Sequence, residues 1–356
     1  IRWLGTSIAS LSTLQRVLVV GSNLRKDHPL FAQRIRQAAR HGCQVSAIAS
    51  VAQDWAMPVQ SFVAQGAAEW MQTLGGIASA VAQEKGIAAP QGAAAASETA
   101  QAIARSLLGG ERKAVLLGNA AAHHAQASQL LALANWIGEN TGASVGYLTE
   151  AANTVGAQFA GAHPVNGGLN AAQMLSGSLK AAVLLNTEPV HDSAAGAQAA
   201  TALAGAEMVV TLSPFKANME FSDVLLPIAP FTETSGSFVN AEGRLQSFHA
   251  VVRPLGDARP AWKVLRVLAN LLGVPGFDFE TSQDVLARAT NAPAGTVTQL
   301  AAAQMSNAVR TVPVAATAAA GEPVVASIYQ LDGLVRRSTS LQLTADARMA
   351  REGVAA

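Results

Sequence analysis

The stretch FSDVLLPIAPFTETSGSFVNAEGRLQ, residues 221–246, carries the pattern that decides the fold. A short apolar run at residues 223–228 is closed by prolines, and a polar loop with Glu233 follows it. Apolar runs bounded by Pro and Gly predict buried strands with functional loops between them. The loop ends in Asn240, Glu242 and Arg244, which either bind a ligand at the sheet edge or form a hairpin rim whose charges pair with one another.

The first fifty residues repeat this strand-and-loop pattern with a helix between two strands. Residues 16–21, RVLVVG, form a compact apolar run typical of a buried parallel strand. Residues 27–40 predict a helix, with Asp27 as its cap and Pro29 in its first turn. Residues 44–49 predict the second strand. The start of the chain is therefore expected to be a β-α-β unit.

Further strands alternate with helices along most of the chain, which predicts a doubly wound, mostly parallel α/β sheet. We expect one α/β region at residues 1–275, made of two parts at about 1–150 and 151–275, and a C-terminal extension at 276–356. Within the extension, residues 291–322 are rich in Ala, Thr, Val and Pro, which predicts partial order. Other expected strands are 113–117, 144–148, 180–185 and 207–212; expected helices are 59–85 with a break near Gly75 and Gly76, 97–108, 123–139, 193–204 and 262–272; residues 153–170 are expected to form a loop.

Three of the predicted strands run directly into an Asn that a His soon follows. The pairs are Asn23 with His28, Asn119 with His123, and Asn186 with His191. Open α/β sheets bind ligands at the carboxyl ends of their strands, so these loops are candidate binding loops. Each Asn is equally suited to a plain turn, with the His capped or at the surface.

Composition excludes several kinds of function. A net charge of +1, with 13% charged residues, argues against a nucleic-acid surface. The single cysteine, Cys43, cannot form an internal disulfide or hold an iron–sulfur cluster, and it is expected to be a buried, inert thiol. The sequence contains neither G-x-G-x-x-G nor a Gly-Lys pair, so both common nucleotide motifs are absent. No segment predicts a membrane span.

Several long motifs resemble one known family. The pattern D-V-x-L-P followed by E-x-x-G-x-x-x-N-x-E-G-R-x-Q resembles a signature of the molybdopterin oxidoreductase superfamily, and LGDARPAW at residues 255–262 resembles its "GEARPDW" segment. Within that superfamily the chain is most similar to the C-terminal half of the large iron–sulfur subunit of bacterial NADH:quinone oxidoreductase, respiratory complex I. The other shared segments are residues 16–39, 183–192 and 329–347.

This resemblance implies a structural and interaction module that supports electron transfer from NADH to quinone. It implies no metal or pterin centre in this fragment, with 4Fe-4S and 2Fe-2S clusters in an N-terminal half that is missing here. The implied partners are other subunits of the peripheral arm of the complex, with no nucleic acid and no direct membrane span. The implied location is cytoplasmic, at the inner face of the bacterial plasma membrane.

The alternative is an active molybdopterin-dependent oxidoreductase, similar to formate dehydrogenase, that binds a guanine dinucleotide pterin. A Cys ligand to molybdenum and the family's C-terminal cap domain are not identifiable in the sequence, which puts this alternative in doubt. A third hypothesis is a free-standing nucleotide-binding module. The resemblance implies that three loops correspond to the family's cofactor loops. They are Gly21, Ser22, Asn23 and His28; Thr187, Glu188 and Pro189; and Asn240, Glu242 and Arg244.

Two expectations concern single elements. Residues 329–347 place apolar side chains beside Arg336 and Arg337, so this segment either docks on another subunit or packs back on its own sheet. Arg244 is expected to hold its loop closed through a carboxylate, with Glu233 or Glu242 as its partner.

Overall fold

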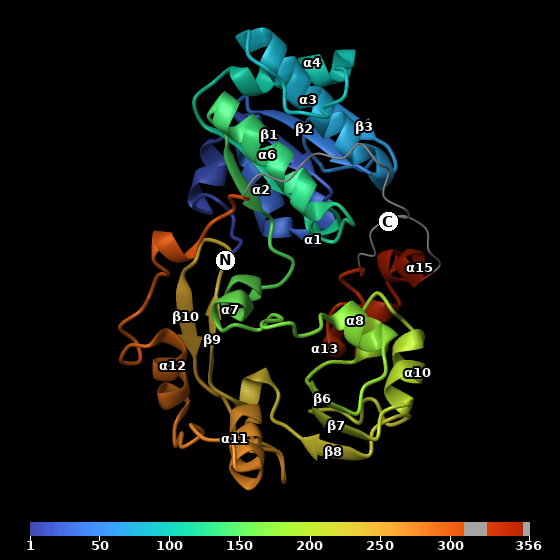
Figure 1. Ribbon diagram of the computed structural model, residues 1–356, viewed down its shortest axis with the longest axis vertical. Coiled ribbons are helices and arrows are strands. Elements are labelled where there is room, and N and C mark those ends of the chain that lie inside the picture. The colour runs from blue at the N-terminus through green and yellow to red at the C-terminus, as the bar shows by residue number, and fades with distance from the viewer. Residues whose placement is uncertain (310–325, 352–356) are drawn as a thin grey trace.

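The computed structural model describes residues 1–309 and 326–351, and it contains three separate sheets (Figure 1). A five-stranded sheet, here the first sheet, lies in the upper part of the view, and a three-stranded second sheet lies at the lower right. A two-stranded antiparallel hairpin lies at the lower left. Residues 310–322 of the predicted 291–322 stretch lie outside the described residues, and the predicted domain division stays a prediction.

All strand pairs of the first sheet are parallel, and the strand order is β3-β2-β1-β4-β5. The strand order therefore reverses between β1 and β4: β2 and β3 extend the sheet on one side of β1, and β4 and β5 extend it on the other. Such a switch point is the usual ligand crevice of an open α/β sheet. The strands are β1 (Arg16–Val20), β2 (Gln44–Ala49), β3 (Ser61–Ala64), β4 (Lys113–Leu117) and β5 (Ser144–Tyr147).

Helices cover both faces of the first sheet because its strands are apolar on both sides. Leu18 and Val115 pack with one helical layer, while Val19 and Leu116 pack with the other. This arrangement confirms the predicted doubly wound α/β fold. The first layer holds α3 (Trp70–Lys85), α4 (Glu98–Leu108) and α6 (Ala127–Thr141); the second holds η1 (Ala9–Thr13), α1 (Leu24–Asp27) and α2 (Pro29–Arg40).

The second sheet is also parallel, in the order β6-β7-β8, but its apolar cluster lies on one face. Leu175 of α8 (Ala171–Ser176) and Leu203 of α10 (Gln198–Ala204) pack against that face. Val183 and Leu185 point away from it and are exposed. The strands are β6 (Ala181–Leu185), β7 (Met208–Ser213) and β8 (Val224–Pro227).

The hairpin pairs β9 (Gly236–Val239) with β10 (Leu245–Phe248). Val239 and Leu245 share a small apolar cluster with Val155 of α7 (Thr154–Phe159) and with Leu300. The other elements are η2 (Ala67–Glu69), α5 (Asn119–Ala122), α9 (Pro189–Asp192), η3 (Phe231–Glu233), α11 (Ala261–Leu271), α12 (Ser282–Thr290), η4 (Ala302–Gln304), α13 (Gly333–Arg337), α14 (Thr339–Gln342) and α15 (Ala345–Arg351). Within the described part of the chain, no helix is both long and apolar enough to cross a bilayer.

The expected break at Gly75 and Gly76 is wrong, since α3 runs straight through both. A Cβ on Gly75 would lie 3.1 Å from the amide nitrogen of Ala94, and one on Gly76 would lie 3.0 Å from the carbonyl oxygen of Ala95. These glycines therefore let a loop pack closely on the helix. The first part of the expected helix at 59–85 also differs, because it contains the strand β3.

Other boundaries differ because loops interrupt the expected helices. Asn23, in place of Asp27, caps a short helix before α2: its side-chain oxygen accepts the N–H of Lys26. Of the expected helix at 123–139, only the part from Ala127 onward is helical, in α6. The expected helix at 193–204 begins at Gln198, in α10, and the expected loop at 153–170 contains α7.

Candidate functional site

The carboxyl ends of β1 and β4 form the first edge, defined by Gly21, Ser22, Asn23 and Asn119. The backbone of Gly21 has φ +66°, and a Cβ there would lie 2.6 Å from the amide nitrogen of Ala121. Glycine is therefore required where the loops after the two strands meet. As a result, Ser22 and Asn119 lie at the switch point of the sheet.

Three buried polar atoms at this edge lack a partner in good hydrogen-bond geometry among the described residues, although Asn119 lies close enough to His28 to act on its pKa. They are Ser22 Oγ, His28 Nε2 and Asn119 Oδ1, whose residues are 3%, 5% and 2% exposed. Buried polar atoms in folded proteins are almost always hydrogen-bonded. These three atoms are therefore available to form hydrogen bonds with a small polar group bound at the first edge.

Titratable groups beside these atoms have pKa values that are shifted by burial and by one another. His123 Nε2 lies 2.8 Å from Glu150 Oε2, and this hydrogen bond raises the pKa of His123 and lowers that of Glu150. Burial raises the pKa of Asp27 to about 6 and lowers that of His28 to about 4. A cavity of about 290 Å³ opens here, lined by both members of the ion pair and by Arg2, Asn119, Tyr147 and Gln158.

The second edge is the loop after β6, residues 186–192, together with Ser213 at the end of β7 and Phe215 beyond it. Asn186 takes a left-handed conformation, φ +48°, which turns the chain sharply away from the strand. Asp192 Oδ2 accepts the N–H of Glu188 at 2.7 Å and the hydroxyl of Thr187 at 3.2 Å. The loop is therefore held rigid from within, with carboxylates at its surface.

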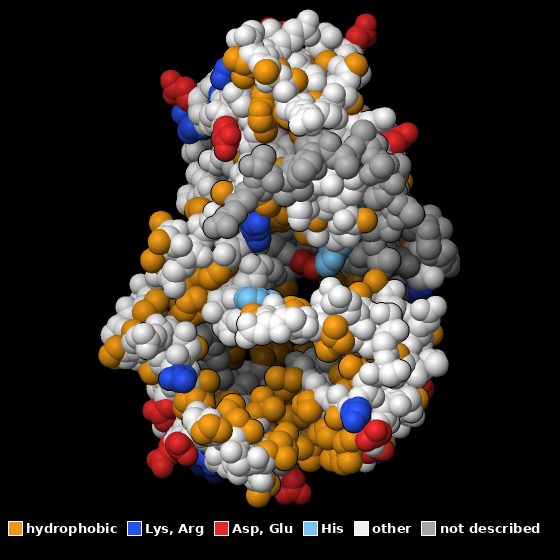
Figure 2. Space-filling model, viewed as in Figure 1, with side chains coloured by type: hydrophobic (Ala, Val, Ile, Leu, Met, Phe, Trp, Pro, Cys, Tyr) orange, Lys and Arg blue, Asp and Glu red, His pale blue; other side chains and the backbone are white. Residues whose placement is uncertain are grey.

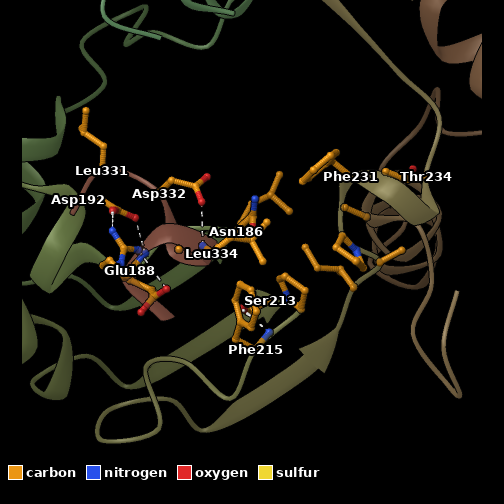
Figure 3. Close-up of a pocket in the computed structure, with 18 residues that line it drawn as sticks. Asn186, Glu188, Asp192, Ser213, Phe215, Phe231, Thr234, Leu331, Asp332 and Leu334 are labelled. Carbon is orange, nitrogen blue, oxygen red and sulfur yellow. Dashed lines mark hydrogen bonds and ion pairs between the residues drawn. The ribbon is translucent and has the colours of Figure 1, made fainter. Parts of the chain in front are cut away.

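A cavity of about 390 Å³ lies at the second edge (Figure 3). Its walls come from the strand ends, from η3 with Phe231, and from a C-terminal segment that we call the tail, residues 326–351. Leu331 and Leu334 of the tail line the cavity opposite Phe231 and Thr234. The tail thus packs on its own chain, one of the two arrangements that the sequence left open.

Two arginines of the tail bind the carboxylates of this loop. Arg336 lies 3.1 Å from Glu188 and 2.7 Å from Asp192, and Arg337 lies 2.8 Å from Glu188. Burial favours the neutral form of Glu188, but hydrogen bonds from Arg337 and Arg336 outweigh it and hold the pKa of Glu188 below its usual range. Glu188 is therefore ionised, and both carboxylates are already paired with arginine.

The turn of the hairpin contains the third group of predicted residues. Asn240 Oδ1 accepts the N–H of Glu242 at 3.1 Å and of Arg244 at 2.9 Å. Glu242 accepts the N–H of Ile8 at 2.7 Å and lies 3.4 Å from Arg244 Nε. Glu233 instead accepts the N–H of Leu255. Glu242 is therefore the partner of Arg244, and it also ties the hairpin to the start of the chain.

The predicted residues thus fall into three places. Gly21, Ser22, Asn23 and His28 meet at the first edge, Thr187, Glu188 and Pro189 belong to the second, and Asn240, Glu242 and Arg244 belong to the hairpin turn. Sequence reasoning missed Glu150, which follows the predicted strand at 144–148 without the Asn-and-His pattern of the other loops. It also missed the pairing of Arg336, which lies in the tail, far from the predicted strands.

Cys43 lies just before β2, at the edge opposite the strand-end loops. It is buried, and burial raises the pKa of its thiol to about 11. A thiol that is protonated and remote from the candidate loops is not a ligand for a group bound there. Among the described residues, no cluster of three or more His, Cys, Asp or Glu side chains is arranged to hold a metal ion.

Comparison with known proteins supplies a family model described as Molybdopterin oxidoreductase, which matches residues 2–271. A probable oxidoreductase, YjgC of Bacillus subtilis (strain 168), is 40% identical over 70 residues, 20% of this chain and 7% of that protein. The putative formate dehydrogenase SAB2186c of Staphylococcus aureus (strain bovine RF122 / ET3-1) is 43% identical over 53 residues, 15% of this chain and 5% of that protein. The matched segments thus span a small part of these relatives.

A solved structure, acetylene hydratase from Pelobacter acetylenicus, superposes with a TM-score of 0.53 at 12% sequence identity. The match covers 80% of this chain and 53% of that one. At this identity the likeness shows a shared fold, and the chain spans about half of the solved structure.

Proposed function

The chain belongs to the molybdopterin oxidoreductase family, and from that premise we propose that it is a structural and interaction module of the large iron–sulfur subunit of a bacterial NADH:quinone oxidoreductase. In this proposal the module supports electron transfer from NADH to quinone without carrying a redox centre. The 4Fe-4S and 2Fe-2S clusters belong to an N-terminal half outside this sequence. Its partners are subunits of the peripheral arm, at the cytoplasmic face of the plasma membrane.

The observation that carries the proposal is the occupied second edge. The family implies a molybdopterin cofactor, and the loop with Thr187 and Glu188 is one place that resemblance assigns to it. The residues there do not fit such a group as the chain stands, because Arg336 pairs with both Glu188 and Asp192 and Gly333 of α13 lies against Glu188. The occupying segment also contains residues 329–347, one of the stretches that resemble the large iron–sulfur subunit.

A second support is the position of the one thiol. Molybdenum sites of this kind use a side-chain ligand, and Cys43 lies at the opposite edge of the first sheet with its thiol protonated. The remaining polar contacts at both edges join elements of the chain to one another. A module of this kind contributes rigid surfaces for binding other subunits and catalyses no reaction itself.

Isolation of the tagged subunit from its own membranes tests this proposal. We expect it to co-purify with other subunits and with NADH:quinone oxidoreductase activity that a quinone-site inhibitor abolishes. Deletion of residues 329–347 is expected to reduce this assembly more than it lowers the melting temperature of the chain. Recovery of the subunit alone, or a deletion that lowers stability and leaves assembly intact, would count against the module.

The second candidate is a molybdopterin-dependent oxidoreductase similar to formate dehydrogenase. It is favoured by the relatives named putative formate dehydrogenases and by the three buried polar atoms at the first edge. Formate-dependent reduction of a dye by the purified protein, together with fluorescent pterin products after oxidation, would support it. Neither signal is expected from the structural module.

A further inference from the structure

The tail is attached to the second edge by a guanidinium that is almost fully enclosed. The side chain of Arg336 is 11% exposed and lies between Glu188, at 3.1 Å, and Asp192, at 2.7 Å. Arg337 donates from both terminal nitrogens to Glu188, at 2.8 and 3.1 Å, and its guanidinium carbon lies 4.1 Å from the ring centroid of Phe215. Two carboxylates and an aromatic face are the groups that recognise guanidinium ions.

The same segment reaches the first edge at its other end. Asp346 of α15 pairs with Lys26 of α1, the helix that begins directly after Asn23. Between these anchors, Gln342 donates to the carbonyl oxygens of Tyr329 and Val335, which fixes α14 against the start of the tail. The tail is therefore one folded unit with an ionic anchor on each sheet region.

Apolar packing contributes little to this attachment. Of the tail side chains that the structure describes, only that of Ala347 is buried, while Leu334 is 46% and Leu343 is 64% exposed. Asp332 caps α13 by accepting the N–H groups of Leu334 and Val335, so the helix is formed locally. The ion pairs are thus the specific part of the attachment.

We propose that Glu188 and Asp192 form a guanidinium-recognition site whose ligand is the arginine-bearing helix α13, and that residues 326–351 act as a strap joining the second edge to the first. The strap keeps these two carboxylates unavailable to other ligands for as long as both are paired with Arg336.

Hydrogen–deuterium exchange of the full chain, followed by mass spectrometry, tests the strap. The double variant Glu188→Gln, Asp192→Asn removes both charges with little change in shape. Amide exchange in residues 333–342 is expected to become at least about tenfold faster, because a mostly buried arginine loses both of its carboxylate partners. Exchange in β1 and β4 is expected to stay unchanged.

The reciprocal double variant Arg336→Gln, Arg337→Gln removes the arginines and is expected to give the same acceleration. It provides an independent test if the first variant misfolds. Arg348→Gln is the matched control, because Arg348 is an exposed arginine of the same tail. Exchange in residues 333–342 within about twofold of the wild type in both double variants, with unchanged circular dichroism, would overturn the strap. Equal acceleration in the Arg348→Gln control would overturn it as well.

Discussion

The two parallel sheets of this protein are stabilised in different ways. Helices cover both faces of the first sheet, and Leu18, Val19, Val115 and Leu116 are fully buried. The second sheet has helices on one face, and hydrophobic side chains gather on the surface between β8 and α11 (Figure 2). Parallel sheets are normally covered on both faces. The first sheet is therefore a self-contained core, while the second depends on contacts made from outside it.

The largest expected effect is the difference between two strand leucines, one from each parallel sheet. Leu116 of β4 is fully buried, so Leu116→Ala should lower the free energy of unfolding by about 2–5 kcal/mol. Leu185 of β6 is 45% exposed, so Leu185→Ala should cost less than about 1 kcal/mol. Urea denaturation of both variants checks this, and equal losses would show that the second sheet is as well covered as the first.

Two glycines with positive φ sharpen the same comparison. Gly21 at the first edge has φ +66° and no room for a Cβ, whereas Gly196, between α9 and α10, has φ +54° and nothing within 4 Å of an added Cβ. Gly196→Ala should therefore cost about 1 kcal/mol from backbone strain, and Gly21→Ala about 2–4 kcal/mol from strain and a clash. Thermal unfolding of the two variants measures the difference between their stability losses. Equal losses would show that the first-edge loops can move apart to make room for the added Cβ.

The pH dependence of stability distinguishes the histidines that follow β1 and β6. Burial lowers the pKa of His28 from 6.5 to about 4 in the folded chain, so the unfolded chain binds this proton more readily. The stability from neutral His28 is complete above about pH 6.5 and is lost as pH falls toward 4. His28→Gln should remove on the order of 1–2 kcal/mol of the loss between pH 7 and pH 5.

The matched control is His191→Gln, since His191 follows β6 but is exposed. Denaturation curves at both pH values should show the wild-type pH dependence in this variant. A reduced dependence in His191→Gln, or an unchanged one in His28→Gln, would contradict the assignment of the buried histidine to the first edge.

The smallest expected effect is at the hairpin turn. Arg244 is 60% exposed and 3.4 Å from Glu242, so Arg244→Ala should change the free energy of unfolding by less than about 1 kcal/mol. Glu242→Ala should cost more, about 1–3 kcal/mol, because the N–H of Ile8 loses its acceptor. A larger loss in Arg244→Ala than in Glu242→Ala would restore the structural role that the sequence predicted for the arginine.

Much of the first sheet could be predicted from the sequence because its elements are local. The run at residues 44–49 and the run at 113–117 match β2 and β4 at both ends, since each is apolar and bounded by turn residues. Gly75 and Gly76 misled the prediction because their role depends on a loop twenty residues away. Glycine in a helix marks either a break or a close approach, and sequence alone does not distinguish them.

The candidate site was less predictable because its contacts are distant in sequence. Gly21, Asn23 and His28 follow a strand and could be singled out, but Glu150 meets His123 through the order of the strands. Arg336 pairs with Glu188 across nearly 150 residues, and the sequence left two arrangements of its segment open. Local pattern identifies the loops, while the pairing of their charges depends on the fold.

The molybdenum content of the purified protein tests the central claim most directly. We propose that the carboxylates of the second edge are already paired with arginines of the tail and that this member of the family serves as a structural module. Elemental analysis should therefore find no stoichiometric molybdenum, and the absorbance spectrum should show no visible chromophore after desalting. Stoichiometric molybdenum accompanied by a pterin would contradict the account and favour the formate dehydrogenase-like alternative.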